Sequence, residues 1–327
     1  MMDPTEQVPL GETGLRVTRL GLGTAPLGGL YREVGEDQAL AVVERAWTDG
    51  LRFFDTAPLY GSGLSEQRLG RALGPRPRDQ YVLATKVGRL LRTDAPPEPG
   101  QAFKGTPPIN PVFDFSATGA DRSLAESLER MGLEQVDVVH IHDPDDYHDE
   151  ALAGAYRALV ELRRNRKISA IGAGMNQAAM LARFAREADF DCFLLAGRYT
   201  LLDQSGLKEL LPLCAERGIA VICGGVFNSG ILADPGPGAH YNYQPAPPEV
   251  VERARRLQVV CERHGVPLPA AAIQFPLGHP AVASVVVGAR STTELDEDVA
   301  MFRWPVPSAL WADLRREDLI AAEAPTP

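Results

Sequence analysis

Cysteine is scarce in this chain, and its cysteines form no recognised motif. The four are Cys192, Cys214, Cys223 and Cys261, and no two are close enough for a C-x-x-C redox or zinc motif. Three of them lie in apolar surroundings, where a thiol behaves as a small hydrophobic side chain. This usage of cysteine is typical of a reducing compartment, so we expect a cytoplasmic protein.

Excess positive charge is also lacking. Lys and Arg number 33 against 43 Asp and Glu, and the formal net charge is -10. Such a charge offers no electrostatic basis for binding nucleic acid or an anionic membrane surface. The first residues lack the basic and apolar regions of a signal peptide, and no apolar run reaches the ~18 residues of a membrane span. We expect no nucleic-acid or membrane partner, a small-molecule substrate, and a monomer or small homo-oligomer.

Strand-like and helix-like segments alternate along most of the 327 residues. Short apolar runs predict strands at residues 18–23, 52–55, 81–86, 136–142, 168–173, 192–195, 219–223 and 283–288. Helical patterns cover residues 37–48, 118–131, 150–164, 177–187, 206–217, 248–264 and 292–301. This alternation indicates parallel strands joined by right-handed crossovers, and eight such units can close into a barrel.

The predicted fold class is therefore α/β, a single (β/α)8 TIM barrel formed by residues 1–327 as one domain. Residues 8–17 contain a Gly-rich turn between apolar residues and predict a β-hairpin that caps the N-terminal side. Residues 307–319 predict a short C-terminal helix. We expect residues 1–7 and 321–327 to be disordered tails.

Two connections are too long to be simple links. Residues 89–115 and 224–248 are both rich in proline, and each follows a predicted strand. Loops of this length in a compact domain are usually functional or disordered. Because both lie on the active-site face of a barrel, we interpret them as substrate walls or lids, with mobile surface loops as the alternative.

Polar residues that can handle protons follow three consecutive predicted strands. Asp55 ends the second strand and Tyr60 follows it, Lys86 ends the third, and His142 ends the fourth. We expect these side chains to meet, because the C-terminal ends of barrel strands face the active site. The ammonium of Lys86 can lower the pKa of the Tyr60 phenol, and Asp55 can hold that ammonium in place. His142 can orient a substrate oxygen, so the set suits interconversion of an alcohol and a carbonyl with a nicotinamide cofactor.

Each of these residues also has an ordinary explanation when taken alone. A strand-end Asp often caps a helix, a Tyr often packs, and a strand His is often a core residue. Lys86 alone would suit the Schiff base of a barrel aldolase. His140 shares a strand face with His142, but no third ligand can be located, so we predict no metal site.

Five segments together resemble the signature regions of the aldo-keto reductase superfamily. They are Asp55-Thr56-Ala57-x-x-Tyr60-Gly61, Thr85-Lys86, Ile141-His142, and residues 167–172 and 288–291. The resemblance implies that Asp55, Tyr60, Lys86 and His142 form a catalytic tetrad, with Tyr60 as the general acid/base. Residues 86–89, 113–119, 142–145 and 172–177 also resemble the branch that contains L-fucose, L-galactose and D-threo-aldose 1-dehydrogenases and pyridoxal 4-dehydrogenase. Members of that branch oxidise an aldose at C1, or the pyridoxal hemiacetal, to a lactone.

The resemblance also implies a site for NAD or NADP, bound in extended form without a Rossmann fold. The loop at residues 288–291 joins a strand to a helix start, where backbone amides suit a phosphate. The implied contacts are Gly23, Thr24, Ala25, Asp55, Asn176, Phe227, Ser229, Gly230, Gly288, Arg290, Ser291, Glu294 and Asp298.

Three positions depart from the wider family pattern. The glutamine that usually contacts the nicotinamide amide falls at Ala196, and the aromatic residue that stacks on the nicotinamide falls at Gly224. The Ser-Asn pair after the fifth strand falls at 174–175, as Gly-Met. Our hypotheses are that Asn176 replaces the amide partner and that Phe227 supplies packing.

Glu294 bears on the choice of cofactor. It stands where a basic residue often holds the 2′-phosphate of NADP, and a carboxylate there repels phosphate. We therefore expect NAD or NADP, with NAD favoured. The alternative is purely structural, because Ser291 and Glu294 also form an S-x-x-E capping box, and Arg290 could still serve a phosphate.

The sequence thus predicts an enzyme, an NAD(P)-dependent oxidoreductase that oxidises an aldose or cyclic hemiacetal to a lactone. A reductase of aldehydes or ketones on the same four residues is an alternative, and use of NADPH would favour it. A nicotinamide-binding regulatory subunit is a further alternative, which tight cofactor binding without turnover would favour.

Overall fold

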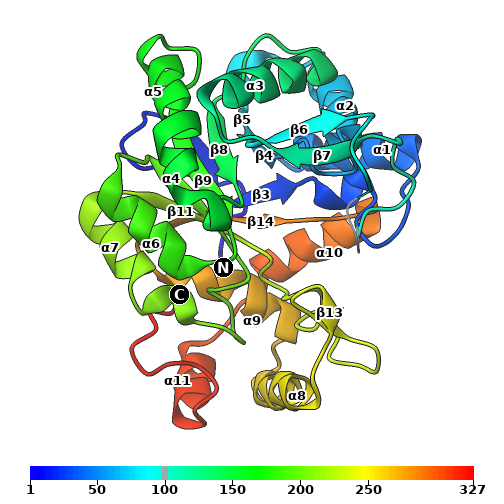
Figure 1. Ribbon diagram of the computed structural model, residues 1–327. Coiled ribbons are helices and arrows are strands. Elements are labelled where there is room, and N and C mark those ends of the chain that lie inside the picture. The colour runs from blue at the N-terminus through cyan, green and yellow to red at the C-terminus, as the bar shows by residue number, and fades with distance from the viewer. Residues whose placement is uncertain (98–101) are drawn as a thin grey trace.

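The computed structural model describes residues 1–97 and 102–327 (Figure 1). Its centre is a closed barrel of eight parallel strands, which confirms the predicted fold. In order around the barrel these are β10 (Cys192–Ala196), β11 (Ala220–Gly224), β14 (Val282–Val287), β3 (Leu20–Gly23), β4 (Phe53–Asp55), β5 (Val82–Val87), β8 (Val138–His142) and β9 (Ala170–Met175).

Apolar side chains fill the barrel interior near the N-terminal ends of the strands, which we call the bottom of the barrel. Phe53, Val82 and Val138 from three neighbouring strands belong to this inner cluster and are at most 7% exposed. Leu10 and Val17 join it from the N-terminal hairpin of β1 (Gln7–Pro9) and β2 (Arg16–Thr18), which pair antiparallel. The predicted hairpin is therefore present, and its apolar residues plug the bottom of the barrel.

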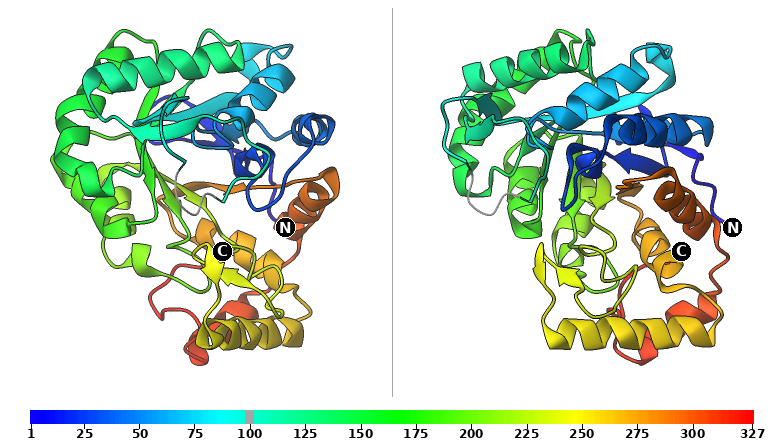
Figure 2. Two further views of the ribbon diagram at one scale, coloured as in Figure 1. Left: turned by 45° about the vertical axis from the view of Figure 1, so that its right-hand side comes forward. Right: turned by 90° about the vertical axis from the view of Figure 1, so that its right-hand side faces the viewer.

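Helices surround the barrel and bury the outward-facing residues of the strands (Figures 1 and 2). The helix α8 lies against α11 at one end of the molecule. The helices are α1 (Glu36–Thr48), α2 (Leu64–Leu73), α3 (Ala117–Met131), α4 (His148–Ala151), α5 (Arg157–Arg164), α6 (Ala178–Glu187), α7 (Leu210–Arg217), α8 (Pro248–Arg263), α9 (Leu268–Gln274), α10 (Thr292–Arg303) and α11 (Ser308–Arg316).

The sequence did not predict α2 and α9. In α2 the buried face includes the charged Glu66 and Arg68, which hide the apolar periodicity. In α9 nearly every residue is buried, so there is no polar face to create a period.

The helix predicted at residues 150–164 is interrupted by a π-helical turn, Leu152–Tyr156. Ala155 N donates to the Phe115 carbonyl oxygen at 2.7 Å, so this amide bonds outside its own helix. A Cβ on Gly154 would lie 2.3 Å from the same oxygen, so glycine permits the close approach. The contact with Phe115 explains why the regular helix does not run through.

Both long loops contain short hairpins. The strand β6 (Arg89–Arg92) pairs with β7 (Asn110–Phe113), and β12 (His240–Tyr241) pairs with β13 (Gln244–Pro245). The hairpins follow β5 and β11, so they stand at the C-terminal mouth of the barrel. Within the first loop, residues 98–101 lie outside the described residues.

We predicted that residues 1–7 and 321–327 are disordered tails. In the structure, Leu20 N donates to the Pro4 carbonyl oxygen at 3.1 Å. Arg315 of α11 donates to the Ala324 carbonyl oxygen at 2.8 Å and to Thr326 Oγ1 at 3.0 Å, and Ala324 is 1% exposed. Residue 4 is thus bonded to the barrel strand β3, and residues 324 and 326 are bonded to α11.

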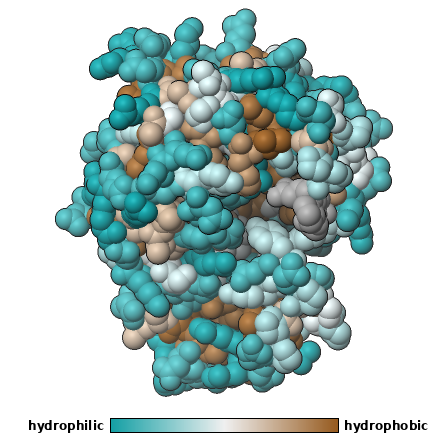
Figure 3. Space-filling model, viewed as in Figure 1, coloured by the Kyte–Doolittle hydropathy of each residue, from teal (hydrophilic) through white to brown (hydrophobic). Residues whose placement is uncertain are grey.

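The face seen in Figure 3 is covered mainly by hydrophilic residues, with hydrophobic ones gathered in patches in its upper and lower parts. No helix within residues 1–97 and 102–327 is both long enough and apolar enough to cross a membrane. The same residues contain no group of three or more His, Cys, Asp or Glu side chains placed to hold a metal ion.

Candidate active site

A buried ion pair joins the ends of β4 and β5. Lys86 Nζ donates to the two carboxylate oxygens of Asp55 at 2.8 and 2.7 Å and to the Thr56 carbonyl oxygen at 2.8 Å. Lys86 is 1% exposed and Asp55 is 2% exposed. Burial raises the pKa of Asp55, and the charge of Lys86 opposes that shift. Three acceptors hold the ammonium in place, which argues against a Schiff-base role for Lys86.

Tyr60 lies directly beside this pair. Its ring centroid is 4.7 Å from Lys86 Nζ and 5.9 Å from the ring centroid of His142, which stands edge-on to it. Burial raises the pKa of Tyr60 well above 10, and the charge of Asp55 adds to the shift. Our sequence-based prediction had the opposite sign, because it neglected the burial of the phenol and the pairing of Lys86 with Asp55. Burial and the Asp55 charge thus both act against the phenolate form of Tyr60.

His142 completes the predicted tetrad at the end of β8. Burial lowers its pKa well below 6.5, and the charges of Arg89 and Lys86 act in the same direction. Within the described residues its Nδ1 has no hydrogen-bond partner, and its Nε2 lies 3.6 Å from the Asp143 carboxylate. His142 is thus a neutral imidazole that can donate to or accept from a substrate oxygen.

His140 lies two residues before His142 on β8, so it is on the same face of the strand and deeper inside the barrel. It is fully buried, and neither ring nitrogen has a hydrogen-bond partner in residues 1–97 and 102–327. Burial lowers its pKa to about 3, with a further contribution from the charge of Lys86. A Cβ on Gly172 would lie 2.1 Å from His140 Nδ1, so the glycine makes room for the ring.

A cavity of ≈ 490 Å³ extends from Asp55 and Tyr60 to the start of α10. It is lined by most of the predicted cofactor residues, namely Gly23, Ala25, Asp55, Asn176, Phe227, Ser229, Gly230, Gly288, Arg290, Glu294 and Asp298. Thr24 and Ser291 are not among the lining residues. Thr24 Oγ1 donates to the Asp55 carbonyl oxygen at 2.9 Å, and Ser291 Oγ caps α10 by accepting from Glu294 N at 3.2 Å.

Two features of the cavity fit a nicotinamide dinucleotide. Asn228 lines it, and the buried Asn228 Oδ1 accepts no hydrogen bond from the described residues, so it can serve a ligand donor. Gly288 lines it as well, where a Cβ would lie 2.6 Å from the Pro26 ring. The missing side chain lets the loop before α10 pack close to Pro26; Arg290 N in this loop is bonded to Glu294, so a phosphate would use other amides at the start of the helix.

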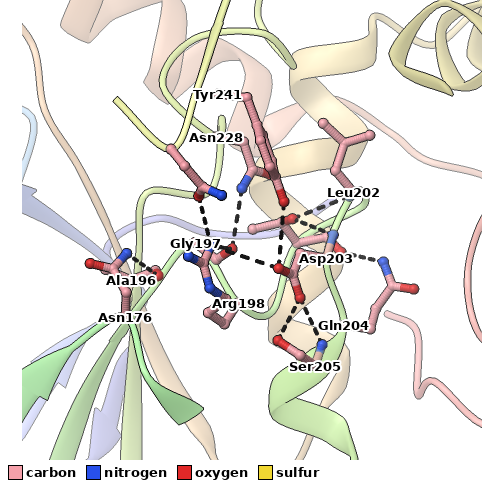
Figure 4. Close-up of polar contacts among 12 residues, drawn as sticks. Asn176, Ala196, Gly197, Arg198, Leu202, Asp203, Gln204, Ser205, Asn228 and Tyr241 are labelled. Atoms are coloured by element: carbon pink, nitrogen blue, oxygen red, sulfur yellow. Dashed lines mark hydrogen bonds and ion pairs between the residues drawn. The ribbon is translucent and has the colours of Figure 1, made fainter. Parts of the chain in front are cut away.

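The hairpin β12–β13 is tethered over this cavity by polar contacts (Figure 4). Arg198 Nη1 donates to Asn242 Oδ1 at 2.8 Å, and the same nitrogen lies 3.7 Å from the Asp203 carboxylate. Tyr241 Oη donates to that carboxylate at 3.5 Å. The tether brings Asn242 and Tyr243 to the cavity wall, which sequence reasoning missed. The only signal had been the tyrosines in a proline-rich loop.

Asn176, our candidate for the nicotinamide amide partner, is held in place from β10. Its Nδ2 donates to the Ala196 carbonyl oxygen at 2.8 Å (Figure 4). Ala196 stands where the family usually has glutamine, so the carbonyl at that position anchors the asparagine. Sequence reasoning also missed Tyr31 and Asn228, which line the same cavity.

Acidic residues gather at the α10 end of the cavity. Glu294 accepts from Arg290 N at 2.8 Å and pairs with the Arg290 guanidinium at 2.9 Å. Burial raises the pKa of Asp298 to about 8, and the charges of Glu294 and Glu297 contribute. Arg290 is therefore neutralised by Glu294, and further carboxyl groups surround the pair.

Known proteins resemble this chain over nearly its full length. A model of the aldo/keto reductase family matches residues 19–317. The chain is 43% identical to pyridoxal 4-dehydrogenase of Microbacterium luteolum, over 97% of this chain and 98% of that protein. It is also 43% identical to D-threo-aldose 1-dehydrogenase of a Pseudomonas species, over 96% and 97% of the two chains. The holo form of an aldo-keto reductase from Bacillus halodurans matches with a TM-score of 0.75 and 25% identity, over 98% of each chain. The chain therefore belongs to the aldo/keto reductase family and is an oxidoreductase.

Proposed function

We propose that this enzyme oxidises the C1 hydroxyl of an aldose, or of a comparable cyclic hemiacetal, to a lactone with NAD as the favoured cofactor. The observation that carries the proposal is the grouping of Tyr60, Lys86, Asp55 and His142 at one end of a cavity that fits a dinucleotide. The two relatives at 43% identity, a pyridoxal dehydrogenase and an aldose dehydrogenase, support this substrate class.

In the proposed reaction, the phenolate form of Tyr60 takes the proton of the C1 hydroxyl, C1 gives up a hydride, and the C1–O bond becomes a carbonyl. A nicotinamide bound in the cavity would supply the hydride acceptor for this direction and the hydride donor for the reverse one. His142 forms a hydrogen bond to the reacting oxygen and fixes its position between the imidazole and Tyr60. Asp55 holds Lys86 beside the Tyr60 ring, so the ammonium stabilises the phenolate form of Tyr60 that accepts the proton.

Reduction of an aldehyde on the same residues is a second candidate. The raised pKa of Tyr60 favours it, because a phenol that holds its proton is ready to act as the acid. Both directions use the same residues, so the preferred cofactor and the substrate distinguish them.

The α10 end of the cavity supports NAD over NADP. A 2′-phosphate there would meet the carboxylates of Glu294 and Glu297, and Arg290 is the basic residue among the cavity-lining residues that the structure describes. Like charges at close range are unfavourable even when partly screened by solvent.

The proposal is tested by following nicotinamide reduction with NAD and NADP in parallel, against L-fucose, L-galactose, D-arabinose and pyridoxal. We expect turnover with NAD and at least one aldose. Turnover restricted to aldehyde reduction with NADPH would overturn the assigned direction and cofactor.

Tyr60→Phe tests the assigned chemistry. It should lower kcat by about 10²- to 10⁴-fold, the usual contribution of a positioned acid or base. Cofactor binding, measured by fluorescence quenching, should not change. Tyr156→Phe is the matched control, because the Tyr156 hydroxyl bonds only the backbone of Asp189, away from the site. A Tyr60→Phe enzyme as active as the control would contradict the mechanism.

A further inference from the structure

We propose that Asp143, held by Arg89, binds the hydroxyl group on the carbon next to the reacting carbon. The enzyme then selects α-hydroxy aldehydes and their cyclic hemiacetals over aldehydes that lack this hydroxyl. The inference rests on the proposed function and adds a specificity-determining subsite to it.

The backbone at Asp143 is unusual. Asp143 follows His142 at the end of β8 and has φ +47°, in the left-handed region, while its amide donates to the Gly174 carbonyl oxygen at 3.0 Å. Residues other than glycine adopt this conformation rarely, and such residues cluster at functional sites. Here the turn keeps the carboxylate beside His142, with Asp143 Oδ2 at 3.6 Å from His142 Nε2.

Arg89 fixes the orientation of this carboxylate. Arg89 Nη2 donates to Asp143 Oδ2 at 2.8 Å, and the guanidinium lies over the Phe113 ring, 4.3 Å from its centroid. The arginine is 7% exposed, whereas the Asp143 side chain is 32% exposed, so Arg89 holds a carboxylate that a ligand can still reach. Gly88 permits this path, because its φ is +101° and a Cβ there would lie 2.3 Å from the Phe115 ring.

Neighbouring oxygens of a sugar are about one hydrogen bond apart. If His142 Nε2 bonds the reacting oxygen, the adjacent hydroxyl falls within reach of the Asp143 carboxylate. A carboxylate accepts up to four hydrogen bonds, and Asp143 Oδ1 accepts none from the described part of the chain. The second oxygen is therefore available for a substrate hydroxyl, and Phe103, whose ring centroid is 6.1 Å from that of Tyr60, offers an apolar surface near the reacting centre.

The competing explanation is that the Arg89–Asp143 pair only fastens the β6–β7 hairpin to the barrel. A fastening role would affect all substrates equally, whereas a subsite would affect only those that carry the hydroxyl. The test therefore compares pairs of substrates that differ by this one group. One pair is an aldose and its 2-deoxy analogue in oxidation, and the other is glycolaldehyde and acetaldehyde in reduction with NADH.

The variants are Asp143→Asn and, as the matched control, Asp145→Asn. Asp145 lies in the same loop, but it accepts from Gln177 Nε2 at 2.8 Å, whereas Asp143 accepts from Arg89. In the wild type, kcat/KM should favour the hydroxylated member of each pair by roughly 10- to 100-fold, the effect of one hydrogen bond to a charged group. Asp143→Asn should reduce this preference to a few-fold, mainly through the hydroxylated substrate, while the control keeps it.

Three outcomes overturn the inference: no preference for the hydroxyl in the wild type, a preference that Asp143→Asn leaves intact, or an equal loss on both members of a pair. Failure of the proposed function is recognised separately. If the glycolaldehyde preference depends on Asp143 while no aldose is oxidised, the subsite stands and the lactone-forming activity does not. Absence of turnover with every substrate rejects both.

Discussion

Replacement of Lys86 by methionine tests how the ion pair at the centre of the site contributes to stability. In Lys86→Met, the Asp55 carboxylate loses both hydrogen bonds to Nζ while it stays 2% exposed. A buried charge left without its partner costs about 3–5 kcal/mol. We expect a loss of that size in the free energy of unfolding at pH 7, measured by urea denaturation.

The double variant Asp55→Leu with Lys86→Met should recover most of this loss, because two well-packed apolar side chains can replace a buried ion pair at little cost. The double variant should nevertheless lack activity. Arg122→Met on α3 is the control, since Arg122 pairs with Glu126 at 2.7 Å but is 61% exposed, and exposed pairs contribute about 0–1 kcal/mol. A Lys86→Met loss no larger than that of Arg122→Met would refute the reasoning.

Three further predictions concern the barrel interior and the cofactor end. His140 has a pKa lowered from 6.5 to about 3, so on acidification only the unfolded chain gains its proton, and stability should fall by about 2 kcal/mol between pH 7 and 5. His140→Leu should remove this part of the acid dependence in urea titrations, and an unchanged dependence would contradict the assignment. Gly172→Ala places a Cβ 2.1 Å from His140 Nδ1 and should lower the free energy of unfolding by about 1–3 kcal/mol. Part of this loss should be relieved in a His140→Ala background, and additive effects of the two substitutions would disprove the contact. Glu294→Gln frees Arg290 and removes one negative charge from the cofactor end of the cavity. The ratio of the Kd for NADP to the Kd for NAD should therefore fall roughly 5- to 10-fold in fluorescence titrations. A constant or rising ratio would be evidence against this role of Glu294.

The barrel could be predicted because buried parallel strands are nearly continuous apolar runs that end in polar residues. This pattern located Asp55, Lys86 and His142 at neighbouring strand ends without any knowledge of contacts. The helix α2 could not be found in this way, because its Glu66 is buried against Arg130 of α3, at 2.7 Å. A charged residue that is satisfied by a distant partner cannot be distinguished from a surface residue in the sequence.

The pKa shifts of the site residues were harder to predict than the identity of those residues. The sign of the Tyr60 pKa shift depends on the depth of burial and on the pairing of Lys86 with Asp55, which the sequence does not state. Similarly, Arg89 and Asp143 are 54 positions apart and meet because of the positive φ angles at Gly88 and Asp143. Such contacts depend on the three-dimensional path of the loops.

The apolar plug at the bottom of the barrel has a consequence for the timing of proton transfer. Leu10, Val17 and Phe53 are each 0% exposed, so this apolar layer separates the site from the solvent below the barrel. If Tyr60 takes the substrate proton, the direct path of that proton to bulk water leads through the mouth, which the bound molecules occupy during turnover. Release of the proton to the solvent would then coincide with departure of the product, and a pH indicator in stopped flow would report product release.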